Sequence, residues 1–262
     1  MSAIVTARRR IKARVAQTEH AIDGAYHHAL SQAHPAVNHF AQEMHDAGDV
    51  ALILWLHQSG HLAKLQSVTR NTIHTFSQHT QSIIATSQDD AVKQGNDAAK
   101  ATIAAVLAGW AFKHGTQAAL AKIEHALLVG SRTNILLTKL SGNVLNRITK
   151  LLYAGISPYL APTQIAERIT QILDMARNQT LTIARTETFN AYRAATLAAF
   201  QANSDVVDSW TWVAGPGCCA FCAGMDGTVH SLDEEMDTHP NCGCLQQPNI
   251  KSQMDTSDIE ED

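Results

Sequence analysis

All five cysteines of the chain lie between positions 218 and 244, and a histidine stands among them. The core of this cluster reads Cys219-Ala-Phe-Cys222, then sixteen residues, then His239-Pro-Asn-Cys242-Gly-Cys244. Thiolate sulfur and imidazole nitrogen are ligands that zinc binds well, and four of them close a tetrahedral site. A C-x-x-C pair followed closely by H-x-x-C-x-C therefore indicates a metal site.

The residues alone leave three states of this cluster open: a structural metal, disulfides or free thiols, and a catalytic metal. A catalytic zinc keeps three protein ligands and one open position, whereas this cluster is rich in ligands, which favours a structural metal. Cys218 is the expected spare, because the spacing from Cys219 to Cys222 suits a zinc knuckle better. The predicted metal is a structural zinc, and its predicted ligands are Cys219, Cys222, His239, Cys242 and Cys244.

The sequence lacks the motifs of several enzyme classes. The run Pro216-Gly-Cys218 with Cys219-x-x-Cys222 is faintly similar to half of the zinc-deaminase motif, but no histidine is followed two positions later by the glutamate that those enzymes need. H-E-x-x-H, G-x-S-x-G and G-K-[ST] are absent as well. The sequence therefore gives no support for a hydrolase, a protease or an ATPase.

The charge balance argues against a general nucleic-acid binder, because the formal net charge is −4. One dense basic run stands near the start of the chain, and it could contact DNA or an acidic protein surface. A solvated helix end explains the same run equally well. Its members are Arg8, Arg9, Arg10, Lys12 and Arg14.

The sequence shows no signal peptide and no membrane span. The first residues lack the apolar run that follows the charges of a signal peptide. The longest apolar stretches, 50–56 and 101–112, fall short of the roughly 20 residues that cross a bilayer. A reducing cytoplasm is therefore the expected place of synthesis, and it favours thiolates over disulfides.

The elements that must position the cysteines are predicted to be helices first and strands last. From Ala3 to about Tyr153 the pattern is helical, with Pro35 as the only proline. The segment 155–162 contains two prolines and breaks the helix. One helix then begins at Pro162 or Thr163, and a second is expected from about Asn178 to Gln201.

A strand is predicted over Val206–Val213, where β-branched and aromatic residues alternate with polar ones. Residues 228–230 are a candidate partner strand after a turn at 225–227. The fold class is therefore mainly α with a small α+β C-terminal domain that the Cys/His cluster closes. The predicted organisation is a helical N-terminal region (1–155), a compact domain (156–250) and an acidic, disordered tail (251–262).

The order of motifs from residue 155 to about 247 resembles the Mu protein F-like family of phage head morphogenesis proteins, also called minor capsid proteins. An amphipathic helix is followed by Arg185-Thr186-Glu187, a strand with tryptophans, C-x-x-C, a nearby glycine and H-P-x-C-x-C. The chain departs from the family at Gly243, where the family usually has arginine. A binding role for that arginine therefore does not carry over.

The resemblance implies a non-enzymatic protein of the virion, in the head interior or at the portal vertex, that is present in the host cytoplasm during assembly. The implied partners are portal, capsid and scaffold proteins, with no membrane. The implied role is assistance in procapsid assembly. The alternative function is a zinc-stabilised nucleic-acid-binding module that associates with packaged DNA through the basic run.

Overall fold

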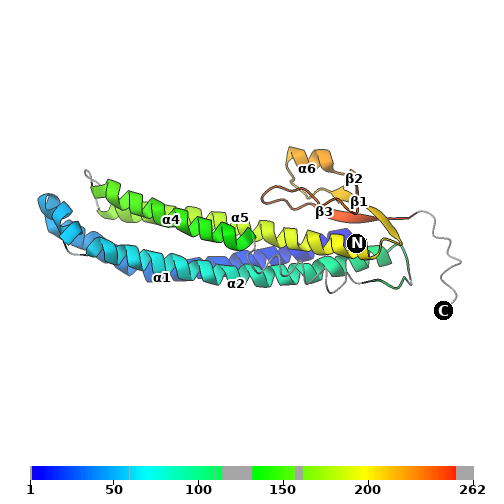
Figure 1. The fold of residues 1–262 in the computed structure, drawn as a ribbon, viewed down its shortest axis with the longest axis horizontal. Coiled ribbons are helices and arrows are strands. Elements are labelled where there is room, and N and C mark those ends of the chain that lie inside the picture. Colours follow the sequence, from blue (N-terminus) through cyan, green and yellow to red (C-terminus); the bar gives the residue numbers. More distant parts are fainter. Residues whose placement is uncertain (1, 59, 109, 114–131, 157–161, 252–262) are drawn as a thin grey trace. The chain divides into compact units, whose positions relative to one another are not determined.

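A computed structural model describes residues 2–58, 60–108, 110–113, 132–156 and 162–251 of the chain. Long helices come first, and three short strands with one small helix follow (Figure 1). The helices are α1 (Ala3–Gln58), α2 (His61–Ala104), α4 (Arg132–Ile156), α5 (Pro162–Ala202) and α6 (Ala220–Met225). The strands are β1 (Val207–Val213), β2 (Val229–Ser231) and β3 (Leu245–Ile250).

Two of the helix boundaries follow from backbone chemistry. Gly60 separates α1 from α2 with a φ of 68°, a left-handed conformation that glycine adopts without strain. The predicted break after residue 155 is confirmed, since α4 ends at Ile156 and α5 begins at Pro162. Pro35 lies inside α1 and does not end it.

The two helices predicted after Pro162 are one continuous helix, α5. The prediction of a break near Asn178 was wrong. No glycine or proline stands between residues 163 and 201. Nothing in the backbone chemistry of that stretch therefore stops the helix.

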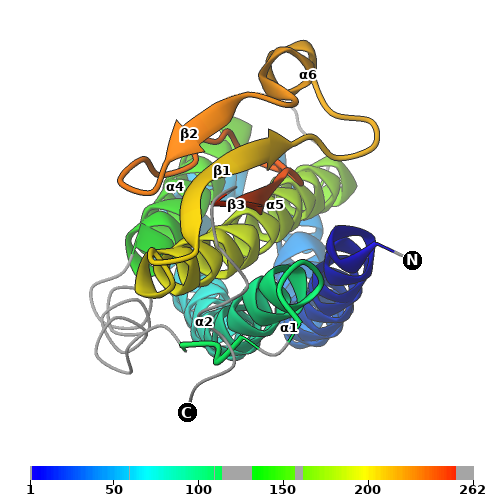
Figure 2. The same ribbon diagram turned by 90° about the vertical axis from the view of Figure 1, so that its right-hand side faces the viewer.

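The three strands form one antiparallel sheet with β1 in the centre, between β2 and β3 (Figure 2). Thr211 lies opposite Val229 on β2 and opposite Gln247 on β3. The predicted strand at 206–213 and its predicted partner at 228–230 are confirmed within one residue. The third strand, β3, is an element that the sequence analysis missed.

The chain packs into two compact units that do not follow its sequence order. One unit, here called the sheet unit, contains residues 1–18, 84–131 and 184–262. The other, here called the bundle unit, contains residues 19–83 and 132–183. The functional division at residue 155 remains a prediction, and the acidic tail from residue 252 lies outside the described residues.

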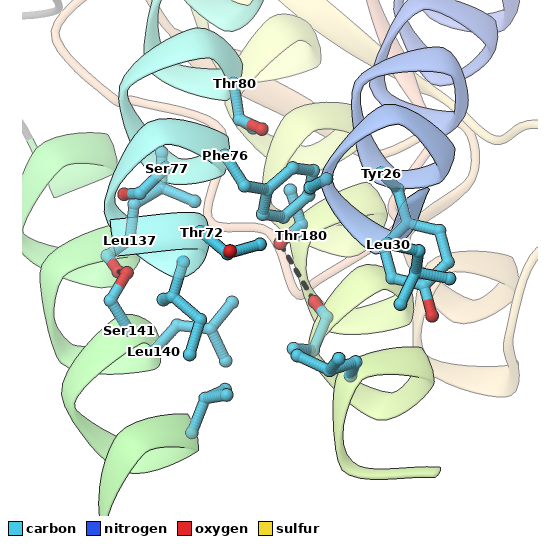
Figure 3. Close-up of a pocket in the computed structure, with 15 residues that line it drawn as sticks. Tyr26, Leu30, Thr72, Phe76, Ser77, Thr80, Leu137, Leu140, Ser141 and Thr180 are labelled. Atoms are coloured by element: carbon cyan, nitrogen blue, oxygen red, sulfur yellow. Dashed lines mark hydrogen bonds between the residues drawn. The ribbon is translucent and has the colours of Figure 1, made fainter. Parts of the chain in front are cut away.

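The bundle unit has a core built from all four of its helical segments. Phe40, Ile73, Val144 and Ile172 are among its buried members. A small apolar cavity lies in this unit, and Tyr26, Phe76, Leu137 and Thr180 are among its lining residues (Figure 3). Most of its lining surface is apolar, although several threonine and serine residues contribute to it.

In the sheet unit, segments distant in sequence share one core. Ile11, Val92 and Tyr192 are buried together, with Leu245 at the start of β3. Gly95 lies so close to α5 that a Cβ there would overlap the backbone oxygen of Tyr192. The C-terminal part of α5 thus packs closely on the last turns of α2, with the sheet on another side (Figure 1).

These observations confirm the predicted fold class, mainly helical with a small sheet near the C-terminus and a Cys/His cluster. Among the described residues, no helix is both long enough and apolar enough to cross a bilayer.

Candidate metal centre

The first pair of cysteines is placed by the start of α6. Cys219 is the N-cap of this helix, and its sulfur lies 3.5 Å from the backbone nitrogen of Cys222, which donates to it. A side chain that caps a helix accepts a backbone N–H from the first turn. The cap therefore directs both sulfurs toward the same side of the turn.

The other three candidate ligands, His239, Cys242 and Cys244, are placed by the loop 238–244. The backbone N–H of Cys242 donates to the carbonyl of His239 at 3.2 Å, which closes a turn. Asn241 has a φ of 64°, and asparagine tolerates this left-handed conformation better than most residues. Upstream, the indole Nε1 of Trp210 donates to the carbonyl of Glu234 at 3.1 Å, which ties the connecting segment to β1.

The structure brings all five predicted ligands together in two overlapping groups. Cys219, Cys222 and His239 form one group. Cys222, Cys242 and Cys244 form the other, and within each group the ligand atoms lie within 4.8 Å of one another. Cys222 belongs to both groups, so its sulfur is the centre of the cluster.

The sulfur–sulfur distance matches that around a zinc ion, and the sulfur–nitrogen distances are a few tenths of an ångström shorter. Two thiolates about 2.3 Å from a tetrahedral zinc lie about 3.8 Å apart, and a thiolate and an imidazole nitrogen about 3.5 Å apart. The sulfurs of Cys222 and Cys242 are 3.8 Å apart. Nε2 of His239 is 3.2 Å from the sulfur of Cys219 and 3.1 Å from that of Cys222. The donor set and its spacing therefore fit zinc.

The tautomer of His239 also suits metal binding. Its Nδ1 lies 2.9 Å from the carbonyl oxygen of Pro240. A carbonyl only accepts, so this contact places the ring proton on Nδ1. Nε2 then presents its lone pair to the sulfurs, as a metal-binding imidazole does when its other nitrogen donates to a carbonyl.

The thiols of the cluster differ in their electrostatic environment. The hydrogen bond from the backbone of Cys222 lowers the pKa of Cys219, which is exposed. Burial raises the pKa of Cys222 and that of Cys242. A buried thiol resists ionisation without a nearby cation, and a bound metal ion supplies one.

All five cysteines lie in the described part of the chain, and all five are free thiols there. Cys218, the predicted spare, is half-buried and belongs to neither ligand group. It therefore offers a matched control for substitutions at the other four.

The motif Arg185-Thr186-Glu187 lies on α5 against the loop of the second ligand group. The guanidinium of Arg185 donates to the side-chain oxygen of Asn241 at 2.8 Å. The backbone N–H of Asn241 donates to the hydroxyl of Thr186 at 3.1 Å. Glu187 is buried, with 3% of its surface exposed. The first two motif residues thus hold the loop that carries His239 and Cys242.

Comparison with known proteins bears on the same part of the chain. Residues 144–247 match the family described as Phage Mu protein F like protein. This segment is similar to the Mu F-like family and is here called the Mu F-like segment. The match confirms the resemblance and supports a role in phage head morphogenesis and an association with the virion. No curated protein and no solved structure matches the chain.

The Mu F-like segment contains one buried residue that the sequence analysis missed, Arg193. Its guanidinium donates to the carbonyls of Cys244 and Cys242 at 3.0 and 2.6 Å. Burial lowers the pKa of Arg193, while the thiols of Cys242 and Cys244 oppose that change. No side-chain pattern in the sequence identifies this arginine, because its acceptors are backbone carbonyls.

The departure from the family pattern at Gly243 is compatible with the backbone. A Cβ at this position would meet only the Phe189 ring, at 4.0 Å. Glycine is therefore not required there by close packing.

The basic run does not form one outward-facing surface. Arg8 donates to the carbonyl of Val213 at 3.1 Å, and Arg14 pairs with Asp90 at 3.2 Å. Arg9, Arg10 and Lys12 are exposed. Since Arg8 and Arg14 contact the protein itself, the run presents less positive charge to a partner than its sequence implies.

Proposed function

We propose that this protein is a minor head protein of a phage or prophage. In this proposal it assists head assembly by binding portal or capsid proteins, it catalyses no reaction, and a structural zinc holds its Mu F-like segment together. The observation that supports this most strongly is that the family match and the Cys/His cluster coincide. The proposed places of action are the head interior or the portal vertex.

The zinc part of the proposal is supported by the donor set. Five candidate ligands from two short segments surround the sulfur of Cys222. A segment of this size buries a limited apolar core, and small domains of this kind commonly depend on a metal. One zinc bound by Cys222 and three of its neighbours would join α6 to the loop 238–244.

The non-enzymatic part is supported by the number of ligands around the centre. A catalytic zinc uses three protein ligands and keeps a fourth position for water or substrate. Here additional thiols surround the same point, so they would occupy that position. The family is moreover one of phage head morphogenesis, a typically structural role.

The binding part is tested with the complete chain. The tagged protein and the portal protein encoded by the same phage would be produced together and separated by size-exclusion chromatography. We expect the two proteins to elute together. A major capsid protein from the same phage serves as a second candidate partner.

Two outcomes would contradict this part of the proposal. One is that neither the portal nor the capsid protein elutes with the chain. The other is that the purified chain is retained on DNA with an affinity that falls steeply as salt rises, which is the signature of phosphate contacts. The second outcome would favour the nucleic-acid-binding alternative through Arg10 and Lys12.

A further inference from the structure

A buried cation lies beside Cys242 and Cys244 of the proposed metal centre. Arg193 is on α5, and 4% of its surface is exposed. Burying an arginine is costly unless its N–H groups are paired with acceptors. The acceptors of its hydrogen bonds therefore show which part of the structure Arg193 holds in place.

The acceptors of Arg193 are the backbone carbonyls of two candidate metal ligands. Nε donates to the oxygen of Cys244 at 3.0 Å, and Nη2 donates to the oxygen of Cys242 at 2.6 Å. The guanidinium thus bridges the carbonyl groups of the two cysteines on either side of Gly243. This arrangement fixes the separation and the direction of the two peptide groups that carry the thiols.

The guanidinium is itself held in one orientation. Its Nη1 donates to the side-chain oxygen of Asn190 at 3.0 Å, one turn earlier on α5. The Phe189 ring lies under it, with the ring centroid 5.3 Å from Cζ. Asn190 and Phe189 come from the same helix as Arg193. The orientation of the guanidinium is therefore set by α5 itself and not only by the loop.

The pairing of β3 with β1 begins only after Cys244, the last of the candidate ligands in the sequence. The first residue of β3 is Leu245, paired with Val213. Between residues 238 and 244, the contacts described above come from one internal turn and from α5. α5 therefore supplies the side-chain hydrogen bonds that hold this loop, and Arg193 makes the two that lie nearest to the thiols of Cys242 and Cys244.

We propose that Arg193 is the positioning residue of the metal centre. By donating to the carbonyls of Cys242 and Cys244, its guanidinium keeps the two thiols close enough to bind one metal ion. This inference rests on the proposed zinc site. A zinc ion with three thiolates and one imidazole carries a net negative charge, and the guanidinium lies where it offsets that charge. Lysine carries the same charge but offers no planar fork.

The test compares the zinc affinity of the full chain with that of three variants. Arg193→Lys keeps the charge and removes the fork, and Arg193→Met removes both. Arg168→Lys is the matched control, because Arg168 is an exposed residue of the same helix. Affinity is measured by competition with a chromophoric chelator, and the absorption of the cobalt-substituted proteins reports the ligand geometry.

We expect Arg193→Lys and Arg193→Met to bind zinc roughly 10- to 100-fold more weakly than the wild type, as outer contacts of metal ligands usually do when they are removed. The cobalt spectrum of Arg193→Lys should change, while Arg168→Lys should match the wild type in both measurements. A zinc affinity of Arg193→Lys within twofold of the wild type, with an unchanged cobalt spectrum, would overturn the inference.

A measurement on the wild type covers the case in which both Arg193 variants fail to fold. The Nε–H proton of Arg193 should exchange slowly with solvent in the metal-free protein as well as in the zinc-loaded one, as seen by NMR. Rapid exchange of this proton in the metal-free protein would overturn the inference about Arg193 and leave the proposed function intact. A wild type that binds no zinc would instead contradict the proposed function.

Discussion

The backbone N–H of Asn241 donates to the hydroxyl of Thr186 at 3.1 Å, across 55 residues of sequence. This contact connects the family motif on α5 to the loop that carries the second group of candidate ligands. The helix provides the hydroxyl of Thr186 as the acceptor that the backbone N–H of Asn241 needs.

Thr186→Val should test this contact with little change in shape. The substitution removes the hydroxyl and leaves the amide of Asn241 without its partner, so we expect the free energy of unfolding to fall by about 1 kcal/mol. Thr182→Val is the control, because the hydroxyl of Thr182 bonds to Asn178 within the helix. Urea unfolding measures both, and equal losses in the two variants would contradict a special role for Thr186.

Cys222→Ser should disrupt the cluster at its centre. We expect the fluorescence of Trp210 and Trp212, which are buried beside it, to shift to longer wavelength as the sheet loosens. The helical circular dichroism of the bundle unit should remain. Cys218→Ser should leave both signals unchanged, and an unchanged spectrum in Cys222→Ser would show that the cluster does not stabilise the sheet unit.

Gly95→Ala should strongly destabilise the protein, because the added methyl group would overlap the backbone oxygen of Tyr192. We expect a loss of roughly 1–3 kcal/mol, as for other overpacked positions. Gly142→Ala, in a helix with open space around it, should instead stabilise by about 0.5–1 kcal/mol. Thermal unfolding of the two variants should therefore shift in opposite directions, and shifts of the same sign would contradict the close packing of α2 on α5.

Tyr26 should make the stability of the protein depend on alkaline pH. Burial raises the pKa of Tyr26 well above its usual 10, and its hydrogen bond to Asp174 at 2.5 Å adds to that effect. The native state thus favours the neutral phenol, so this contribution is complete below pH 10 and is lost as the pH rises above it.

Comparison with Tyr26→Phe isolates this effect, since Tyr192, whose pKa burial raises to about 12, is present in both proteins. Urea unfolding at a series of pH values should show the stability of the wild type falling faster than that of Tyr26→Phe above about pH 10, by at most about 1.4 kcal/mol per pH unit. Parallel curves would show that Tyr26 ionises freely in the native state.

Local chemistry made much of the site predictable. The spacing of Cys219 and Cys222 requires a tight turn, and α6 provides it. The alternation around Trp210 predicts a strand because side chains alternate across a sheet, and β1 is that strand. Two prolines limit where a helix can run, and the break before α5 follows from them.

Features that depend on distant contacts were not predictable in the same way. β3 escaped notice because Pro248 usually argues against a paired strand, yet it lies opposite Trp210. Arg193 gave no signal, since its acceptors are backbone carbonyls that carry no side-chain pattern. The packing of Ile11 beside Tyr192 joins segments far apart in the chain, and periodicity on one helix does not identify its partner.

The metal content of the purified, reduced protein tests the central claim most directly. Elemental analysis should find about one zinc per chain, and X-ray absorption should show a tetrahedral site with mostly sulfur ligands. The absence of zinc, together with a mass spectrum showing disulfides among Cys219, Cys222, Cys242 and Cys244, would contradict the account.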